Sequence, residues 1–240
     1  IPLFAVEILD EDLLDRVPGF TRRMEWFLRY RPDLAELVSH WNEPGQGRVR
    51  LLSLARAFRM KRIVERVVDP AEFLSDYGVR ALSKVHEHVP YVLERGGQRF
   101  EVRYLPAESD SGMFGGNSNW RGPIWWPVNY LLIESLHRFH LYYGDDFVIA
   151  CPTGSTRLLN LGQIADELAR RLITIFEVEA DGRRAALGAH PKFRSEHFKD
   201  HILFYEYFHG DNGRGVGASH QTGWTGLVAK LIQDLKPSHS

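Results

Sequence analysis

Residues 115–130 read GGNSNWRGPIWWPVNY, and the rest of the chain can be interpreted around them. The glycines and asparagines at the start of this stretch are turn formers, so they predict a tight polar loop. Three of the six tryptophans of the chain follow within seven residues, together with Arg121. Indole rings stack on sugar rings and bases, and amide and guanidinium groups hydrogen-bond hydroxyls or anions. The stretch therefore predicts a wall of a site for a polar, ring-shaped ligand; the alternative is a buried tryptophan cluster beneath a turn.

The same stretch leads into the longest apolar helical segment, residues 125–143, which Gly144 closes. A second, amphipathic helix is predicted over residues 163–176. Residues 91–104 alternate around a Gly-Gly pair, which is typical of a β-hairpin. Further helices are expected over residues 1–44, 51–68, 78–86 and 222–235. The pattern predicts a mainly α chain with one β-hairpin, in which the long loops carry function.

The composition is that of an ordinary globular protein, with 44% hydrophobic and 25% charged residues. The 30 basic and 31 acidic side chains give a net charge of −1, which argues against a nucleic-acid or anionic-membrane partner. Basic residues gather over residues 56–66, where a solvated helix face is the main interpretation and a nucleic-acid helix is the alternative. No run reaches the roughly 20 apolar residues of a membrane span.

Cys151 is the one cysteine of the sequence, so neither an internal disulfide nor a thiolate metal cluster is expected, and a cytoplasmic location is favoured. The chain opens on the apolar run Ile1–Val6 rather than on a methionine. Natural N-termini usually fray in polar sequence. We therefore expect the chain to be a piece of a longer protein.

A second cluster of aromatic and polar residues, FYEYFHGDNG, occupies residues 204–213. Glu206 lies among its aromatic residues, where a carboxylate loses part of its hydration. Such a group suits acid–base chemistry near neutral pH. The alternative from composition alone is a structural glutamate paired with an arginine at a helix end.

The remaining motifs argue against a cofactor or a metal. Residues 213–217, GRGVG, lack the Gly-Lys-Ser/Thr ending of a phosphate-binding loop, and no βαβ pattern precedes them. Ser219 and His220 lack the surrounding pattern of a nucleophile elbow. His137 and His140 do not form the His-Glu-x-x-His pattern of a zinc site. We expect neither a cofactor nor a catalytic metal.

Residues 119–130, NWRGPIWWPVNY, resemble the signature loop and helix of glycoside hydrolase family 63. That family includes eukaryotic processing α-glucosidase I, bacterial α-glucosidases, and mannosylglycerate and glucosylglycerate hydrolases. Residues 206–213 resemble its later motif, and residues 223–225 resemble the Gly-Trp-Thr motif that opens its final helix. The three motifs occur in the family's order, whereas residues 1–110 match more loosely. We interpret the chain as similar to the bacterial α-glucosidases and mannosylglycerate hydrolases of the family.

The resemblance implies that residues 1–240 form the C-terminal portion of an (α/α)6 barrel, a toroid of six helical hairpins, with the β-hairpin as an insertion. It also implies an inverting α-glycosidase, which needs two carboxyl groups roughly 6.5–9.5 Å apart, one as acid and one to activate water. The base falls on Glu206. The family's acid is an Asp in an earlier Gly-Leu-Asp-Asp-like motif that this sequence lacks. The expected partners are thus a carbohydrate substrate and the N-terminal part of the same protein, without which the chain is expected to be inactive.

The resemblance also implies which residues contact substrate. The sugar subsite is expected to consist of side chains that stack or hydrogen-bond: Trp120, Arg121, Trp125, Asn129, Gln221 and Trp224. Of these, Asn129 and Gln221 either contact hydroxyls or order the loops. Asn117 and Asn119 are expected to shape the loop itself.

Three rival functions stay open at this point. The first is a non-catalytic carbohydrate-binding domain built on the same helical barrel. The second is a helical protein-interaction scaffold in which the tryptophans are core residues. The third is a nucleic-acid-binding protein that uses the basic face of residues 56–66.

Overall fold

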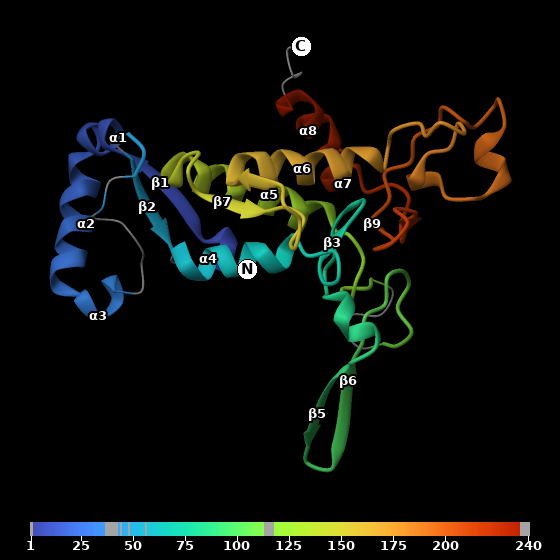
Figure 1. The fold of residues 1–240 in the computed structure, drawn as a ribbon, viewed down its shortest axis with the longest axis horizontal. Coiled ribbons are helices and arrows are strands. Elements are labelled where there is room, and N and C mark those ends of the chain that lie inside the picture. Colours follow the sequence, from blue (N-terminus) through green and yellow to red (C-terminus); the bar gives the residue numbers. More distant parts are fainter. Residues whose placement is uncertain are drawn as a thin grey trace. The chain divides into compact units, whose positions relative to one another are not determined.

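The computed structural model describes residues 2–36, 43, 45–47, 49–55, 57–112 and 118–235. The chain forms two compact units, of which the first comprises Ile1–Glu65 with Leu131–Ala165 and the second comprises Arg66–Tyr130 with Asp166–Ser240. Two long helices contribute to both units: α5 (Trp126–Tyr143) and α6 (Leu161–Thr174) (Figure 1).

The first unit begins with a strand pair that the sequence patterns did not predict. β1 (Val6–Asp10) and β2 (Val49–Ser53) are antiparallel, with Ile8 opposite Leu51. The prediction of helix over residues 1–44 and 51–68 is therefore wrong for these segments. Each segment is short and apolar, and its strand conformation depends on a partner about 40 residues away, which a local pattern does not reveal.

Aspartate and proline residues start the helices of this unit. Asp10 caps α1 (Glu11–Arg16), since its carboxylate accepts a hydrogen bond from the N–H of Asp12 at 2.9 Å. The helices α2 (Pro18–Tyr30) and α3 (Pro32–Ala35) each begin with a proline. Proline suits this position because it has no backbone N–H, and an N–H in the first helical turn would have no partner within the helix. The other elements of the unit are η1 (Pro2–Phe4), α4 (Ala57–Val67), β7 (Val148–Ala150) and β8 (Leu158–Asn160).

The core of the first unit is made by β2, α4, β7 and parts of α5 and α6. Its most deeply buried side chains come from these elements: Leu51, Met60, Val64, Leu136, Phe139, Ile149, Leu161 and Ile164. Burial on this scale is the main source of stability for such a unit, at about 1.5–3 kcal/mol per large apolar side chain.

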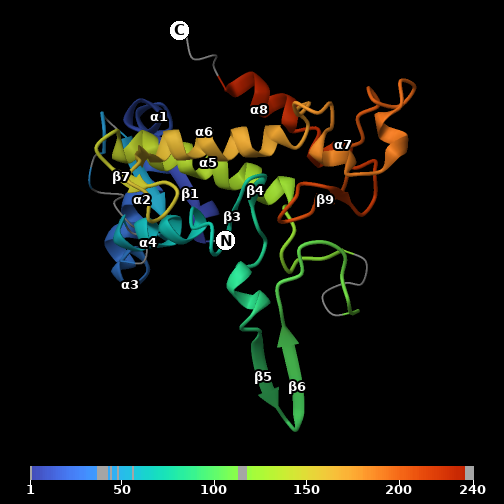
Figure 2. The same cartoon turned by 45° about the vertical axis from the view of Figure 1, so that its right-hand side comes forward.

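In the second unit, the predicted β-hairpin is confirmed. β5 (Tyr91–Arg95) pairs with β6 (Gln98–Val102) around the Gly-Gly turn, with Leu93 opposite Phe100. Figure 2 shows this hairpin extending away from the other elements of the unit. Two shorter antiparallel pairs lie elsewhere in the unit: β3 (Leu74–Ser75) with β4 (Gly78–Val79), and β9 (Tyr207–Phe208) with β10 (Gly215–Val216).

The two strongest helix predictions are confirmed. α5 ends at Tyr143, and Gly144 follows it with a positive φ of 71°, which favours glycine as the helix stop. α6 runs over nearly the predicted residues. The expected helix over 222–235 is divided into α7 (Thr222–Thr225) and α8 (Val228–Asp234), and residues 78–86 form β4 and part of η2 (Lys84–Glu87) instead of a helix.

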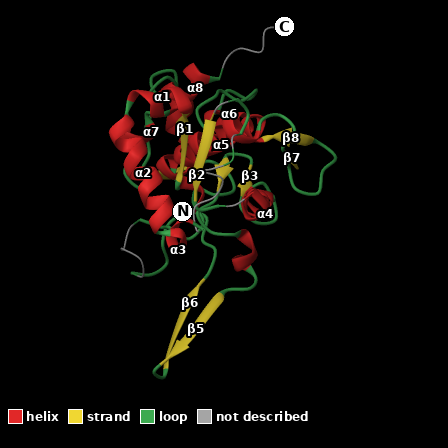
Figure 3. Ribbon diagram, turned by 90° about the vertical axis from the view of Figure 1, so that its left-hand side faces the viewer, coloured by secondary structure: helices red, strands yellow, loops and turns green. Residues whose placement is uncertain are grey.

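Figure 3 shows the resulting mixture of helices with small two-stranded sheets. The remaining short helical turns are η3 (Ala185–Leu187) and η4 (Pro191–Arg194). The predicted (α/α)6 barrel stays a prediction. Across the described residues, no helix has both the length and the apolar character needed to cross a membrane.

Candidate active site

Glu206 immediately precedes β9, and both of its carboxylate oxygens are hydrogen-bonded. Ser118 donates its hydroxyl to Oε1 at 2.7 Å, and the N–H of Ala218 donates to Oε2 at 3.3 Å. The N–H of Glu206 in turn donates to the carbonyl of Ala218 at 2.7 Å. A carboxylate offers about four acceptor positions, so this half-buried group is held in place and can still accept a proton from a water or a hydroxyl.

The chain passes so close to Glu206 that one position excludes a side chain. Gly217 has a φ of 73°, and a Cβ there would lie 2.7 Å from Glu206 Oε2. Both the backbone conformation and the space therefore favour glycine. The glycine-rich run that follows Glu206 in the sequence thus shapes the surroundings of the carboxylate.

Two of the three tryptophans of the signature loop form a stack with Tyr207, the residue that follows Glu206. The rings of Trp120 and Trp125 are parallel within 4°, with centroids 3.7 Å apart. Tyr207, the neighbour of Glu206, stacks on Trp125 at 4.7 Å, and Trp224 meets Trp125 edge-on at 5.8 Å.

Burial separates the roles of these rings. Trp125 is only 1% exposed, whereas Trp120 keeps 45% of its surface exposed. Trp120 is therefore the outer ring of the stack, where a sugar ring could lie, and Trp125 lies behind it. The half-buried Trp224 has a buried Nε1, for which the described residues provide no hydrogen-bond partner.

Arg121 and Asn119 are buried inside the loop. The guanidinium of Arg121 donates to Ser109 Oγ at 2.5 Å and lies 3.3 Å from Asp110 Oδ1. The amide of Asn119 donates to the carbonyls of Leu105 and Ala107, each at 2.7 Å. Both side chains therefore attach residues 105–110 to the signature loop that follows them. The structure thus places Arg121, predicted to line the sugar subsite, in contact with protein groups, while Asn119 has the loop-shaping contacts that were expected.

Asn129 and Gln221 also make contacts that order the chain. Asn129, on α5 and 2% exposed, accepts from the N–H of Val79 at 2.8 Å and donates to its carbonyl at 3.0 Å. The backbone of Gln221 accepts from the N–H groups of Trp224 and Thr225 at 3.2 and 3.0 Å, at the start of α7. Asn117 lies outside the described residues.

A charged cluster next to this region was missed by the sequence analysis. Asp211 Oδ1 accepts from Arg80 Nη2 and Lys84 Nζ, both at 3.0 Å, and from the hydroxyl of Tyr104 at 3.1 Å. Arg80 is buried, 8% exposed, and donates to the carbonyl of Leu74 at 2.5 Å. Because the four polar residues lie on distant segments, no sequence motif connects them. They tie the loop after β9 to β3, β4 and η2.

Electrostatics in the cluster favour the charged form of Asp211. Burial acts to raise the pKa of Asp211, but hydrogen bonds from Lys84 and Arg80 outweigh it and hold the pKa below its usual value. Burial raises the pKa of Tyr104, which stays a neutral donor. Burial also lowers the pKa of His209, whose Nδ1 accepts from the N–H of Asp211 at 3.1 Å.

Ser118 is the other functional candidate that sequence reasoning missed. It lies within the quoted loop, two residues before Trp120, yet a serine in a polar loop carries no distinguishing pattern. In the described parts of the chain, no group of three or more histidine, cysteine, aspartate or glutamate residues could hold a metal ion. The geometry is thus a fixed carboxylate that is hydrogen-bonded to the loop bearing a partly exposed indole stack, an arrangement suited to acid–base chemistry on a ring-shaped polar ligand.

The chain is similar to proteins of a known family. Residues 49–151 match the model of the glycosyl hydrolase family 63 C-terminal domain. An uncharacterized protein of Saccharomyces cerevisiae is 48% identical over 239 residues, which make up 98% of this chain and 22% of that protein. The matched family segment includes Trp120 and Trp125 and ends before Glu206.

Two relatives have named activities. The mannosyl-oligosaccharide glucosidase of Saccharomyces cerevisiae is 23% identical over 176 residues, covering 72% of this chain and 15% of that enzyme. A probable mannosyl-oligosaccharide glucosidase of Schizosaccharomyces pombe is 23% identical over 177 residues, covering 73% of this chain and 15% of that protein. This chain therefore spans about a fifth or less of the length of these relatives. Residues 49–151 are thus similar to a family 63 glycosyl hydrolase domain, and two of the relatives carry the name of a glucosidase.

Proposed function

We propose that this chain is the portion of a family 63 inverting glycoside hydrolase that carries the general base, Glu206, and acts on an α-glucoside or related α-glycoside. The main support for this proposal is the fixed position of the Glu206 carboxylate. It accepts a hydrogen bond at 2.7 Å from Ser118, which lies in the same loop as Trp120. The two named relatives are glucosidases, which favours an α-glucoside over a mannosylglycerate.

The chemistry follows from this placement. Glu206 removes a proton from the attacking water, and its hydrogen bonds to Ser118 and Ala218 keep the carboxylate aimed at that water. The outer face of Trp120, which is exposed, stacks on the sugar ring.

Inversion also needs a general acid, with its carboxyl group roughly 6.5–9.5 Å from that of the base. We propose that this acid comes from another part of the same polypeptide, in an (α/α)6 barrel of which residues 1–240 are the C-terminal portion. The partners of this chain are then its carbohydrate substrate and the rest of its own polypeptide.

The Glu206→Gln variant of the complete polypeptide tests the assignment. An amide keeps the shape but cannot accept the proton, so kcat on an α-glucoside is expected to fall roughly 10²–10⁴-fold, while substrate binding, measured by tryptophan fluorescence, changes little. Glu94→Gln, on the exposed strand β5, is the matched control and should retain full turnover. Turnover near the wild-type level in Glu206→Gln would exclude Glu206 as the base.

The same assay on the wild-type protein distinguishes a hydrolase from a non-catalytic carbohydrate-binding domain. A carbohydrate-binding domain would show the fluorescence change with an α-glucoside and release no glucose. The exposed ring of Trp120 is compatible with that function, but binding alone does not need a carboxylate with both oxygens fixed.

A further inference from the structure

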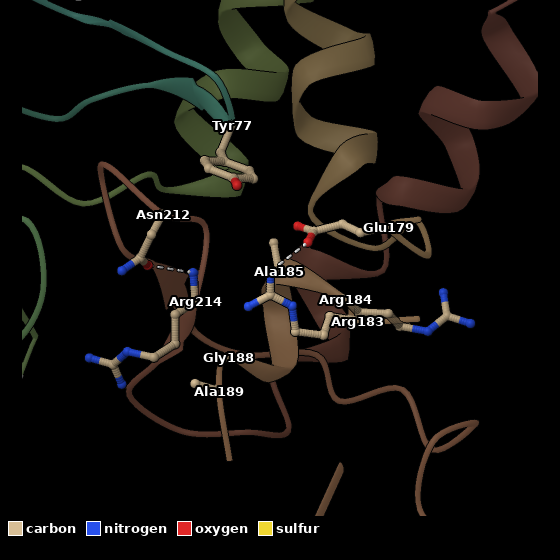
Figure 4. Close-up of a pocket in the computed structure, with 9 residues that line it drawn as sticks. All are labelled: Tyr77, Glu179, Arg183, Arg184, Ala185, Gly188, Ala189, Asn212 and Arg214. Carbon is tan, nitrogen blue, oxygen red and sulfur yellow. Dashed lines mark hydrogen bonds and ion pairs between the residues drawn. The ribbon is translucent and has the colours of Figure 1, made fainter. Parts of the chain in front are cut away.

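A separate cavity lies in the second unit, between the turn that joins β3 to β4, the segment after α6 that includes η3, and the loop that joins β9 to β10. It has a volume of about 350 Å³, near the lower end of the range for small-molecule sites, about 300–1,000 Å³. Figure 4 shows its polar side chains, which come from three segments of the chain: Tyr77, Glu179, Arg183, Arg184, Asn212 and Arg214. None of the residues proposed for the active site lines it.

The walls of this cavity are held by the chain itself. The ring of Tyr77 packs against the backbone of Gly213, where a Cβ would lie 2.6 Å from Cδ1 of the ring and φ is 69°. Asn212 Oδ1 accepts from the N–H of Arg214 at 3.1 Å, which fixes the turn. The neighbouring Asp211 is anchored by its hydrogen bonds to Arg80 and Lys84. The cavity therefore exists before any ligand binds, which lowers the cost of binding.

The arginines that line the cavity are already engaged by other groups of the protein. Arg183 is paired with Glu179 at 3.5 Å and with Asp181, and Arg214 Nη2 lies 3.2 Å from Glu108 Oε1. The guanidinium of Arg184 donates to the carbonyl of Phe176, so each of the three lining arginines has a partner within the protein. An anion would have to compete with carboxylates that already hold two of the arginines.

What the cavity offers instead is a mixture of donors and acceptors beside an aromatic ring. Burial and the charge of Glu179 raise the pKa of Tyr77, so its hydroxyl is a donor at neutral pH. Guanidinium and amide N–H groups add donors, and the Glu179 carboxylate and the Asn212 carbonyl add acceptors. Vicinal hydroxyl groups, which both donate and accept, match such a set.

We propose that this cavity is a second carbohydrate site, which binds one ring of a neutral, polyhydroxylated ligand apart from the candidate active site. Tyr77 supplies a hydroxyl donor and part of the ring surface, while Glu179 and Asn212 hydrogen-bond ligand hydroxyls. A protein with both sites holds a branched or extended glycan at two points, which strengthens its overall binding.

The test uses the complete polypeptide with Trp120→Ala, which weakens sugar binding at the candidate active site, and Glu206→Gln, which stops turnover there. Methyl α-D-glucopyranoside is titrated, and saturation-transfer difference NMR reports its binding. A saturable signal is expected to remain. Adding Tyr77→Phe and Asn212→Asp, which keep the ring and the turn, should weaken this binding roughly tenfold, because a hydrogen bond contributes about 0.5–1.5 kcal/mol. Tyr91→Phe, on the exposed hairpin, is the matched control.

Loss of all saturable binding in the Trp120→Ala, Glu206→Gln background would overturn the second site, and so would an unchanged affinity after Tyr77→Phe and Asn212→Asp. Inorganic phosphate that displaces the glucoside from this background would identify an anion site and would also overturn the proposal. Turnover of the wild-type protein is measured separately. A result that excludes the second site therefore does not affect the proposed hydrolase function, and an absence of turnover does not affect the second site.

Discussion

At the scale of single residues, Ser118 fixes the orientation of the Glu206 carboxylate. Its hydroxyl is the donor to Oε1, at 2.7 Å, while Oε2 has the longer bond to the N–H of Ala218, at 3.3 Å. A carboxylate with one of these bonds removed can rotate away from the attacking water. Ser118 therefore acts through Glu206 as a positioning residue.

Ser118→Ala is expected to lower kcat roughly fivefold and to leave KM nearly unchanged, because one hydrogen bond of about 1 kcal/mol that orients the base is lost. Steady-state kinetics on the complete polypeptide measure both constants. Ser118→Thr keeps the hydroxyl and should recover most of the rate. A defect of equal size in Ser118→Thr, or a change confined to KM, would contradict the positioning role.

The tryptophans show how burial divides residues that look alike in the sequence. Trp120 and Trp125 both belong to the predicted sugar-binding wall, yet one is 45% exposed and the other 1%. The two initial interpretations, a binding wall and a buried cluster, thus describe different members of one stack. Which tryptophan is outside depends on Tyr207, which covers Trp125 from a segment about 80 residues further along the chain.

At the scale of elements, the cluster around Asp211 joins the loop after β9 to β3, β4 and η2. Arg80 and Tyr104 are buried, and both donate to Asp211. Removal of the carboxylate leaves the Arg80 charge buried without its ionic partner, which is strongly unfavourable. The cluster therefore stabilises the loop that forms one wall of the second cavity.

Asp211→Asn is expected to lower the free energy of unfolding by roughly 2–4 kcal/mol at pH 7. The folded-state pKa of Asp211 is lowered, so its contribution is fully present above the unfolded-state pKa, about 3.9, and is lost as pH falls through the folded-state value. The difference between wild type and variant should thus shrink below pH 4. Urea unfolding at several pH values measures it.

The control for this experiment is Asp76→Asn, whose side chain is 92% exposed and lies 3.5 Å from Arg171. An exposed pair of this kind contributes little, so a change within about 0.5 kcal/mol is expected. A wild-type advantage over Asp211→Asn that stays constant from pH 7 to pH 3 would show that the charge of Asp211 is not what stabilises the loop.

At the scale of the whole molecule, the chain spans about a fifth or less of the relatives it matches. The first unit has an open apolar groove of about 570 Å³, lined among others by Phe4, Met24 and Leu52. The side chain of Trp26, on α2, is 60% exposed. Large exposed apolar surfaces usually mark contacts with other protein.

The complete polypeptide is expected to hydrolyse an α-glucoside with inversion, so that the first sugar released is the β-anomer. The 240-residue chain alone should show no turnover, because inversion requires a second carboxyl group as acid. Proton NMR of the anomeric signals during the first minutes of the reaction measures both results. Release of the α-anomer would contradict an inverting mechanism, and full activity of the chain alone would place the acid within it.

Much of the local structure was predictable. The helices α5 and α6 and the hairpin β5–β6 follow from apolar periodicity, a helix-stopping glycine and a Gly-Gly turn, all of which are properties of neighbouring residues. The signature loop and Glu206 were also identified from the sequence as parts of one candidate site, and the hydrogen bond from Ser118 to Glu206 connects them.

The features that the sequence did not predict depend on contacts between distant segments. The pairing of β1 with β2, the burial of Arg121 and Asn129 and the convergence on Asp211 each bring together residues that no local pattern relates. The sequence by itself determined the helices α5 and α6, the hairpin β5–β6 and which residues carry suitable chemistry. Only the tertiary structure decided which of those residues face solvent and which support the others, because burial and hydrogen-bond partners depend on how remote segments pack.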